Sequence, residues 1–450
     1  MLSKPPSTAM AAGMTTTPCP ECEPVDKLRI RISVFMDGTG NNQFNVDHGR
    51  EAHDMDEYDS YTADYSNVAR LAQTMQTNAE EDYHQPIYVQ GIGTKKGKAD
   101  SDYGSGTGEG DYGISTRVTE CMHEILDRVS ARAMARKTVD RLRIDCFGFS
   151  RGAAAARHLI SRLLISLRYF FSTRGITVSK FEIPFVGLFD TVSSYGVGYD
   201  SDTEQLHLDS IKDPIVERVV QLAAGDEHRL NFRLTNIASA GARGLEIFLP
   251  GAHSDIGGGY VDGDSEESRV LLEAPGVYLK ARCEAMRTEL IALGWFTDSE
   301  EIRVRETAQP DIVLRGGGTV KRDSIYDLVA TREKISNRYS YLPLHMMSEY
   351  AGAKKLRFEL TKYDYSGDPD LVAIRSLIDG NRHDGEYWIR CCDPQIQKLR
   401  HGYLHFSAHY AINEYLLKPH VPQFYSVAEQ WSDDDSNRLH GQRRRRVMAG

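Results

Sequence analysis

The stretch Leu142-Arg-Ile-Asp-Cys-Phe-Gly-Phe-Ser-Arg-Gly-Ala-Ala-Ala-Ala-Arg157 decides the fold. Its first residues, Leu142 to Phe147, form a short apolar run of the kind found in buried strands. The next five, Gly148-Phe-Ser-Arg-Gly152, fit the pattern Gly-x-Ser-x-Gly, and an alanine-rich segment of helical character follows. A strand, a tight turn with a central serine and a helix, in that order, are the context of a nucleophile elbow. We expect Ser150 in a strained turn, with its hydroxyl group clear of the sheet near the positive end of the helix. The alternative is a glycine-rich turn whose serine only caps the helix.

The composition is that of an ordinary globular protein. The chain has 450 residues, of which 40% are hydrophobic and 26% charged, which is enough for one large domain or two. A net charge of -10 argues against general attraction to nucleic acid or anionic lipid. The sequence contains no run of 18 apolar residues and no long apolar stretch after a basic start. We therefore expect neither a membrane-spanning helix nor an ordinary secretory signal.

The cysteines predict no disulfide framework. There are seven in 450 residues, and Cys146 lies in the apolar strand while Cys391 and Cys392 are adjacent, so reduced thiols are the simpler expectation. Cys19 and Cys22 form a lone C-x-x-C without partners at zinc spacing, and we interpret them as free thiols.

Strand and helix patterns alternate over the first 260 residues. This alternation predicts an α/β-hydrolase-like fold, with a mostly parallel sheet and helices on both faces. A polar, glycine-rich segment over residues 95–113 is predicted to be a mobile surface loop, and residues 222–232 to be the end of a helix. The expected strands are 28–35, 86–94, 142–147, 181–192, 234–240 and 244–250, and the expected helices are 115–135 and the segment after Ser150.

The pattern changes after Tyr260. Helices are expected over 270–292 and most of 326–380, with short strand-like runs over 295–324, so this region is predicted to be a cap or accessory subdomain. The predicted organisation is a flexible segment 1–27, a catalytic core 28–262, a mainly helical cap 263–400, a return to the core 401–430 and a flexible charged tail 431–450.

Three residues that suit acyl transfer follow predicted strands in a fixed order. Ser150, Asp190 and His253 give the order nucleophile, acid, base. A serine hydroxyl needs a neighbouring base to attack at neutral pH, and histidine has the suitable pKa. Asp255 and His405 form a rival acid and base in the same order. We prefer His253 because its loop is glycine-rich and belongs to the regular sheet region.

The loop after the first strand is a candidate oxyanion hole. Gly38 and Thr39 end that strand, and their N–H groups, with that of Arg151, are placed to stabilise an oxyanion. The loop is equally explained as a turn held by the side chains of Asp37 and Asn41.

The sequence predicts no cofactor and no resident metal. His405 and His409 lie one helical turn apart, but the glutamate of a zinc protease is missing between them. A calcium requirement stays open, because Asp37 and Asp255 can bind a hard cation although no EF-hand spacing is present.

Four motifs occur together and in order: Phe35-Met-Asp-Gly-Thr-Gly-Asn-Asn42, Gly148-Phe-Ser-Arg-Gly-Ala153, Gly187-Leu-Phe-Asp-Thr-Val192 and Pro250-Gly-Ala-His-Ser-Asp-Ile-Gly-Gly-Gly-Tyr260. With them, residues 28–262 resemble the α/β-hydrolase family that contains the GxSxG-class phospholipase effectors of type VI secretion. Weaker similarity is found over 342–347 and 404–407.

The resemblance implies a phospholipase A-type carboxylester hydrolase with Ser150, Asp190 and His253 as its triad. It implies a phospholipid membrane as the substrate surface, a secretion-apparatus carrier, delivery from the producer's cytoplasm into a rival's periplasm, and an immunity protein. Large members carry a membrane-anchoring module, which in this shorter chain is reduced or supplied by residues 263–400. Two alternatives remain at this point: a soluble intracellular esterase for small acyl esters, and a non-catalytic interaction protein on the same fold.

Overall fold

The computed structural model describes most of the chain up to residue 407 and the last four residues. The predictions for Cys19, Cys22, Cys391, Cys392 and His409, and those for most of the two terminal segments, lie outside the described residues. The described residues are 27–56, 58–133, 137–196, 200–201, 203–227, 229, 231–275, 278–297, 301–382, 389, 393–407 and 447–450.

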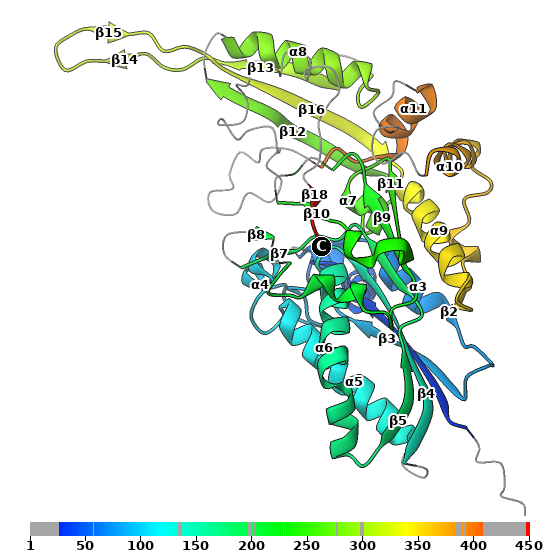
Figure 1. Cartoon of the computed structure of the whole chain (residues 1–450). Coiled ribbons are helices and arrows are strands. Elements are labelled where there is room, and N and C mark those ends of the chain that lie inside the picture. The colour runs from blue at the N-terminus through cyan, green and yellow to red at the C-terminus, as the bar shows by residue number, and fades with distance from the viewer. Residues whose placement is uncertain are drawn as a thin grey trace, which may run out of the picture.

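A seven-stranded sheet forms the centre of the structure (Figure 1). Its strands are β1 (Arg29–Met36), β3 (Tyr83–Val89), β4 (Thr138–Phe149), β5 (Thr177–Glu182), β6 (Val186–Phe189), β9 (Val219–Ala224) and β11 (Gly244–Leu249). Their order is β11-β9-β6-β4-β1-β3, with β5 also beside β4, and every pairing is parallel. The predicted α/β class with a mostly parallel sheet is confirmed.

Helices cover both faces of this sheet (Figure 1). Helices α5 (Ile114–Ala133) and α6 (Arg151–Thr173) pack on one face, and α3 (Asn67–Thr74) and α9 (Tyr341–Gly352) on the other. Val118, Met122 and Ile125 of α5 are buried because apolar residues three and four apart share one side of a helix. The sheet therefore lies between two apolar cores.

The order of the strands makes the carboxyl edge of the sheet the expected place for a ligand-binding site. After β1 the chain adds β3 on one side, and β4, β6, β9 and β11 then follow on the other. The direction of winding thus reverses between β1 and β4, and the carboxyl edge at such a reversal is where open α/β sheets bind ligands. The loops after β1, β4, β6, β9 and β11 all meet at this edge.

A smaller antiparallel sheet follows the core. It consists of β12 (Asp264–Pro275), β16 (Ile325–Ile335) and β13 (Ile302–Thr307), with β16 in the middle and α8 (Tyr278–Ala292) beside it. A hairpin of β14 (Ile312–Val313) and β15 (Thr319–Val320) extends from it, far from the rest of the molecule (Figure 1).

Several local predictions are wrong. The helix end expected over 222–232 begins instead as strand β9, which is buried between β6 and β11 and is apolar apart from Gln221; a short apolar stretch of this kind fits either element. The helix expected over 270–292 begins only at Tyr278, and residues 325–335, expected to be helical, form β16. The strand expected over 181–192 is split, with Pro184 between β5 and β6, and the loop at 95–113 contains helix α4 (Asp102–Thr107).

The end of the chain also differs from its prediction as part of a flexible tail. Residues Val447–Met448 form β18, which pairs in parallel with β10 (Leu234–Thr235). The Gly450 N–H donates to Asn236 Oδ1 at 3.1 Å, so the last residues are fixed against the core.

Cys121, Cys146 and Cys283 are buried free thiols. Within the described part of the chain, no helix is both long enough and apolar enough to span a bilayer.

The remaining elements are short. They are α1 (Gln43–Ala52), α2 (Asp59–Thr62), α7 (His253–Gly257), α10 (Pro369–Asn381), α11 (Pro394–Tyr403), β2 (Met75–Gln76), β7 (Ser194–Tyr195), β8 (Asp200–Ser201), β17 (Arg357–Phe358) and the 3-10 turns η1 (Leu208–Lys212), η2 (Ala238–Arg243), η3 (Asn337–Ser340) and η4 (Thr361–Tyr363).

Candidate active site

Ser150 occupies a sharp turn between β4 and α6. Its backbone angles are φ 57° and ψ -129°, a region that residues with a Cβ atom adopt at a cost of about 1–3 kcal/mol. Two glycines make the turn possible, because a Cβ on Gly148 would lie 2.5 Å from Ala153 Cα and one on Gly152 would lie 2.3 Å from the Asp37 carbonyl oxygen. The strained turn holds Ser150 at the carboxyl edge of the sheet.

Ser150 is covered by its surroundings in this conformation. The residue is only 5% exposed, and the position of its hydroxyl group clear of the sheet stays a prediction. No hydrogen bond joins Ser150 Oγ to His253 Nε2 among those of the described residues. Catalytic hydrogen bonds are often long before substrate binds.

Asp190 and His253 form a buried carboxylate–imidazole pair. Their Oδ2 and Nδ1 atoms lie 2.5 Å apart, and the two residues are 0% and 4% exposed. The second oxygen, Oδ1, accepts the Ala224 N–H at 2.8 Å. Asp190 directly follows β6, the neighbour of β4, and the Ser150 N–H donates to the Phe189 carbonyl oxygen at 3.0 Å. Ser150 and the pair therefore sit at the ends of adjacent strands.

The surroundings of His253 keep its ring uncharged. Phe149 and Phe232 pack against the imidazole, with ring centroids 4.6 and 4.9 Å away. Burial lowers the pKa of His253 below its usual 6.5, and the hydrogen bond and charge of Asp190 raise it again only in part. A neutral imidazole that donates from Nδ1 to Asp190 leaves Nε2 as a proton acceptor.

A second carboxylate fixes the backbone of His253. The His253 N–H donates to Glu227 Oε2 at 3.2 Å, and the same carboxylate accepts from the Arg229 guanidinium at 2.8 Å and from Ser407 Oγ at 3.2 Å. Glu227 is 0% exposed, so this carboxylate is compensated by a buried cation. No motif in the sequence gives Glu227 a role, although its position three residues after the buried strand β9 is a usable signal.

The rival pair Asp255 and His405 also forms, in a neighbouring position. His405 Nδ1 lies 2.8 Å from Asp255 Oδ1, and the His405 and Ala252 N–H groups donate to Oδ2 at 3.1 and 2.8 Å. His405 stacks on Tyr260 with centroids 3.7 Å apart, and its Nε2 is buried without a hydrogen-bond partner among the described residues. The two imidazoles thus belong to separate pairs. His253 and Asp255, predicted to lie in a glycine-rich loop, are part of helix α7, and Asp255 supports the start of this helix at Ala252.

The segment Arg400–Ser407 holds the site from outside the central sheet. Arg400 Nη2 donates to Asp226 Oδ1 at 3.0 Å, and the Phe406 N–H donates to Glu266 Oε1 at 2.7 Å. Together with the contacts of His405 and Ser407, these bonds connect the segment to four buried carboxylates around the loops after β9 and β11. Residues 404–407 are not helical, so His405 does not lie on a helix, and His409 lies outside the described residues.

The loop after β1 is fixed by its own buried carboxylate. Asp37 accepts from the Gly38 N–H at 2.8 Å, from Ser66 Oγ at 2.5 Å and from Tyr88 Oη at 2.6 Å. Burial nevertheless raises the pKa of Asp37 to about 6. Because the Gly38 N–H already donates to Asp37, the N–H of Thr39 is the better candidate in this loop for an oxyanion donor.

Arg151 links this loop to the segment that precedes α5. Its Nε donates to Thr39 Oγ1 at 2.8 Å, and its terminal nitrogens donate to the carbonyl oxygens of Ser105 and Gly106. The region predicted to be a mobile loop is thus tied to the site, and the side chain of Arg151 has a positioning role separate from its backbone N–H.

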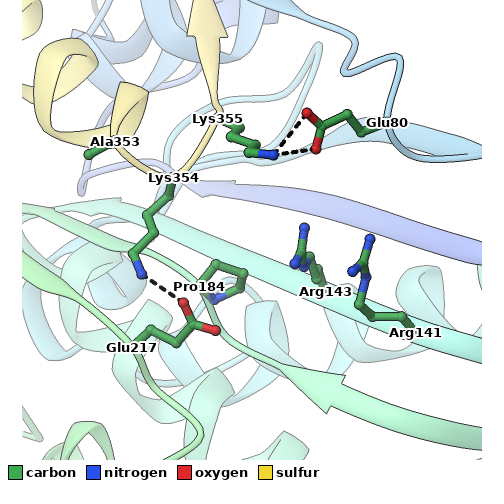
Figure 2. A pocket seen from close by; sticks show the side chains of 8 residues that line it. All are labelled: Glu80, Arg141, Arg143, Pro184, Glu217, Ala353, Lys354 and Lys355. Carbon is green, nitrogen blue, oxygen red and sulfur yellow. Dashed lines mark hydrogen bonds and ion pairs between the residues drawn. The ribbon is translucent and has the colours of Figure 1, made fainter.

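A cavity lined by described residues lies elsewhere (Figure 2). It has a volume of about 200 Å³, and its wall includes Arg141 and Arg143 of β4, at least seven residues before Ser150. Lys354 and Lys355 pair with Glu217 and Glu80 at 2.7 and 2.6 Å, and both arginines pair with Glu81. With its cations engaged by carboxylates and its position away from Ser150, this cavity is no candidate for the acyl-transfer site.

The described residues contain no group of three or more His, Cys, Asp or Glu side chains arranged to hold a metal. Asp37 and Asp255 are the two carboxylates on which a possible calcium requirement rested. Both accept hydrogen bonds from protein donors.

The fold and this edge define an α/β-hydrolase-type protein: a serine in a strained elbow and a buried aspartate–histidine pair follow parallel strands. A family model described as T6SS, phospholipase effector Tle1-like, catalytic domain, matches residues 30–165 and 170–298. This match spans more than half of the chain, and the protein belongs to that family. The predicted family is confirmed.

A solved structure with a TM-score of 0.60 agrees with this fold. A Tle1 effector bound to the VgrG spike of the type 6 secretion system is 23% identical, with a TM-score of 0.60 and 85% of each chain covered. An uncharacterized protein from Pseudomonas aeruginosa is 16% identical, with a TM-score of 0.43, over 80% of this chain and 52% of that one. No curated protein matches the sequence significantly.

Proposed function

We propose that this chain is a phospholipase A-type carboxylester hydrolase that uses Ser150, His253 and Asp190 as a catalytic triad. The observation that carries the proposal is the 2.5 Å contact between Asp190 and His253, two strand-end residues at the edge that Ser150 also occupies. Family membership supports the class of substrate.

In the proposed reaction, Ser150 Oγ attacks the ester carbonyl while His253 Nε2 takes the hydroxyl proton. Asp190 holds the imidazole in the required tautomer and stabilises its charged form. The C–O bond of the tetrahedral intermediate then breaks, and the lysophospholipid alcohol leaves with the proton from His253. Water, activated by the same imidazole, hydrolyses the acyl-enzyme and releases the fatty acid.

The proposed oxyanion donors are the N–H groups of Thr39 and Arg151, with Gly38 as the less suitable third candidate because it donates to Asp37. The Arg151 side chain supports this geometry through Thr39. An ester must reach a serine that is 5% exposed, so the reaction also requires part of the covering surface to move aside. Lids that open at substrate are a common way to exclude water.

The biological setting is proposed from the family. We expect delivery by type VI secretion into the periplasm of a target cell, a carrier in the secretion apparatus and an immunity protein in the producer. The relative whose structure is solved was bound to a VgrG spike, and that likeness supports a spike protein as the carrier here.

The test is lipid-product analysis with purified protein and phospholipid vesicles. Wild type should release fatty acid and lysophospholipid, and Ser150→Ala and His253→Ala should lose this activity. His405→Ala should keep measurable activity, and His48→Ala, which changes an exposed histidine, serves as the matched control. Loss in His405→Ala alone would transfer the base role to His405, and full activity in Ser150→Ala would remove the nucleophile assignment. Activity on short-chain esters with none on vesicles would instead select a soluble esterase.

A further inference from the structure

The β14–β15 hairpin presents apolar side chains to solvent at the end of a long extension. Val313 is 75% exposed, Leu314 51%, and Ile312 and Val320 are each 47% exposed. These are four of the nine large hydrophobic residues that are exposed among the described residues, and they fall within nine consecutive positions. Exposed apolar groups that cluster in this way mark an interaction surface.

The extension is a regular continuation of the accessory sheet. Thr307 pairs with Ile325, and further out Ile312 pairs with Val320 in the same register. We call residues 308–324 the finger. About nine residues separate its base from its tip, so at 3.3 Å per residue it reaches about 30 Å. The turn at Gly316–Gly318 closes it, with the Leu314 N–H donating to the Gly318 carbonyl oxygen at 2.7 Å.

The two faces of the finger differ in chemistry. Because side chains alternate along a strand, Ile312, Leu314 and Val320 share one face. Lys321 belongs to the opposite face with Val313, Arg315 lies in the turn, and Arg322 follows Lys321 toward the base. Residues 312–322 contain these three cations and no carboxylate, and Asp311 and Asp323 flank them, so the finger has a net charge of +1 while the whole chain has a net charge of -10.

We propose that the finger inserts its apolar tip into the headgroup region of a bilayer that contains anionic phospholipid. This inference deepens and rests on the proposed function, since it names the surface to which that hydrolase attaches. Apolar side chains next to lysine and arginine are the combination that binds such an interface. A folded protein partner needs no such local excess of positive charge.

The length of the finger explains how an acidic protein can approach an anionic surface. At physiological ionic strength charges are screened over about 8 Å, and the tip lies about 30 Å from its base. The tip therefore experiences the field of its three cations, of the neighbouring Asp311 and Asp323 and of the lipid, while the repulsion from the body is screened. The finger is joined to the Ile325 end of β16. The other end of β16 leads to Asn337, which contacts Tyr260 near the site. The finger therefore attaches the protein to the membrane and does not line the site.

The experiment measures binding to vesicles of phosphatidylcholine with about one third phosphatidylglycerol, by flotation. All proteins carry Ser150→Ala, so that the lipid stays intact. Replacing Arg315, Lys321 and Arg322 by glutamine should weaken binding about a hundredfold at low salt, because each cation contributes about fivefold. Pure phosphatidylcholine vesicles should bind all proteins weakly and equally.

A second variant tests the apolar face. Changing Ile312, Leu314 and Val320 to serine should weaken binding at least tenfold, whereas Ile165→Ser, which changes another exposed hydrophobic residue of 70% exposure, should leave it unchanged. All these side chains are outside the cores, so unchanged melting curves are expected and would show that the variants fold.

Three results would overturn the proposal: no vesicle binding by the unmodified finger, equal binding by the finger variants, or a concentration-dependent dimer that only the finger variants lose. The same finger changes in a chain with Ser150 intact should leave hydrolysis of a soluble short-chain ester within twofold. If no protein hydrolyses any ester, the proposed function fails, while the flotation result still decides the role of the finger.

Discussion

The backbone strain at Ser150 predicts that the protein is more stable with glycine than with alanine at this position. The φ of 57° and ψ of -129° suit glycine but cost a residue with a Cβ atom about 1–3 kcal/mol, while the extra freedom of glycine in the unfolded chain costs about 0.5–1 kcal/mol. Ser150→Gly should therefore be about 0.5–2 kcal/mol more stable than Ser150→Ala. Both variants lack the hydroxyl, so the comparison isolates the backbone strain.

The assay is thermal and urea unfolding of the two variants side by side. For a chain of 450 residues, an unfolding entropy of about 2.1 cal/mol/K per residue converts this gain to about 0.5–2 °C in Tm. The control is Ile165→Gly against Ile165→Ala on the exposed side of α6, where glycine should be less stable by about 1 kcal/mol. If glycine at 150 is destabilising to the same degree as at 165, the turn is not strained and the elbow argument is refuted.

Four further predictions concern the groups around the serine. Asp190→Asn should lower kcat about 10⁴-fold, and the acid limb of its residual kcat/KM profile should move to lower pH, because Asp190 raises the pKa of His253. In wild type, activity should persist below pH 6.5, since burial lowers that pKa and the base works in its neutral form. His405→Gln should lower kcat about 10–100-fold with little change in KM, because Asp255 then positions the loop of His253 less well, and His405→Asn should recover part of the loss if the Nδ1 donor is what matters. Burial raises the pKa of Asp37 from 3.8 to about 6 in the folded protein. Protonated Asp37 therefore contributes about 3 kcal/mol to the stability of the fold below pH 4, and this contribution is lost as pH rises through 6. Asp37→Asn should make the free energy of unfolding less dependent on pH between pH 4 and 6.

Much of the central sheet could be predicted because its signals are local. The apolar run before Gly148 is a strand by length and the alanine-rich segment after it a helix by composition, and both agree with the turn between them. Asp190 and His253 could be chosen because each follows such a run, and parallel strands bring their carboxyl ends to one edge.

The rest depends on partners distant in sequence. Val219–Ala224 is a strand because β6 and β11 lie beside it, and β16 is a strand because β12 and β13 pair with it; no local pattern shows either neighbour. The contact of Glu227 with Ser407 joins residues 180 positions apart. The burial of Ser150 results from how the loops pack over the edge, which the Gly-x-Ser-x-Gly pattern does not encode.

The central claim is that Ser150 is the nucleophile, and covalent trapping tests it most directly. The protein is treated with a fluorophosphonate in the presence of phospholipid vesicles, and the labelled residue is located by peptide mass spectrometry. The account predicts one adduct, on Ser150, which is absent in Ser150→Ala and strongly slowed in His253→Ala. An adduct on a different residue, or full phospholipid hydrolysis by a protein that takes up no label, would contradict it.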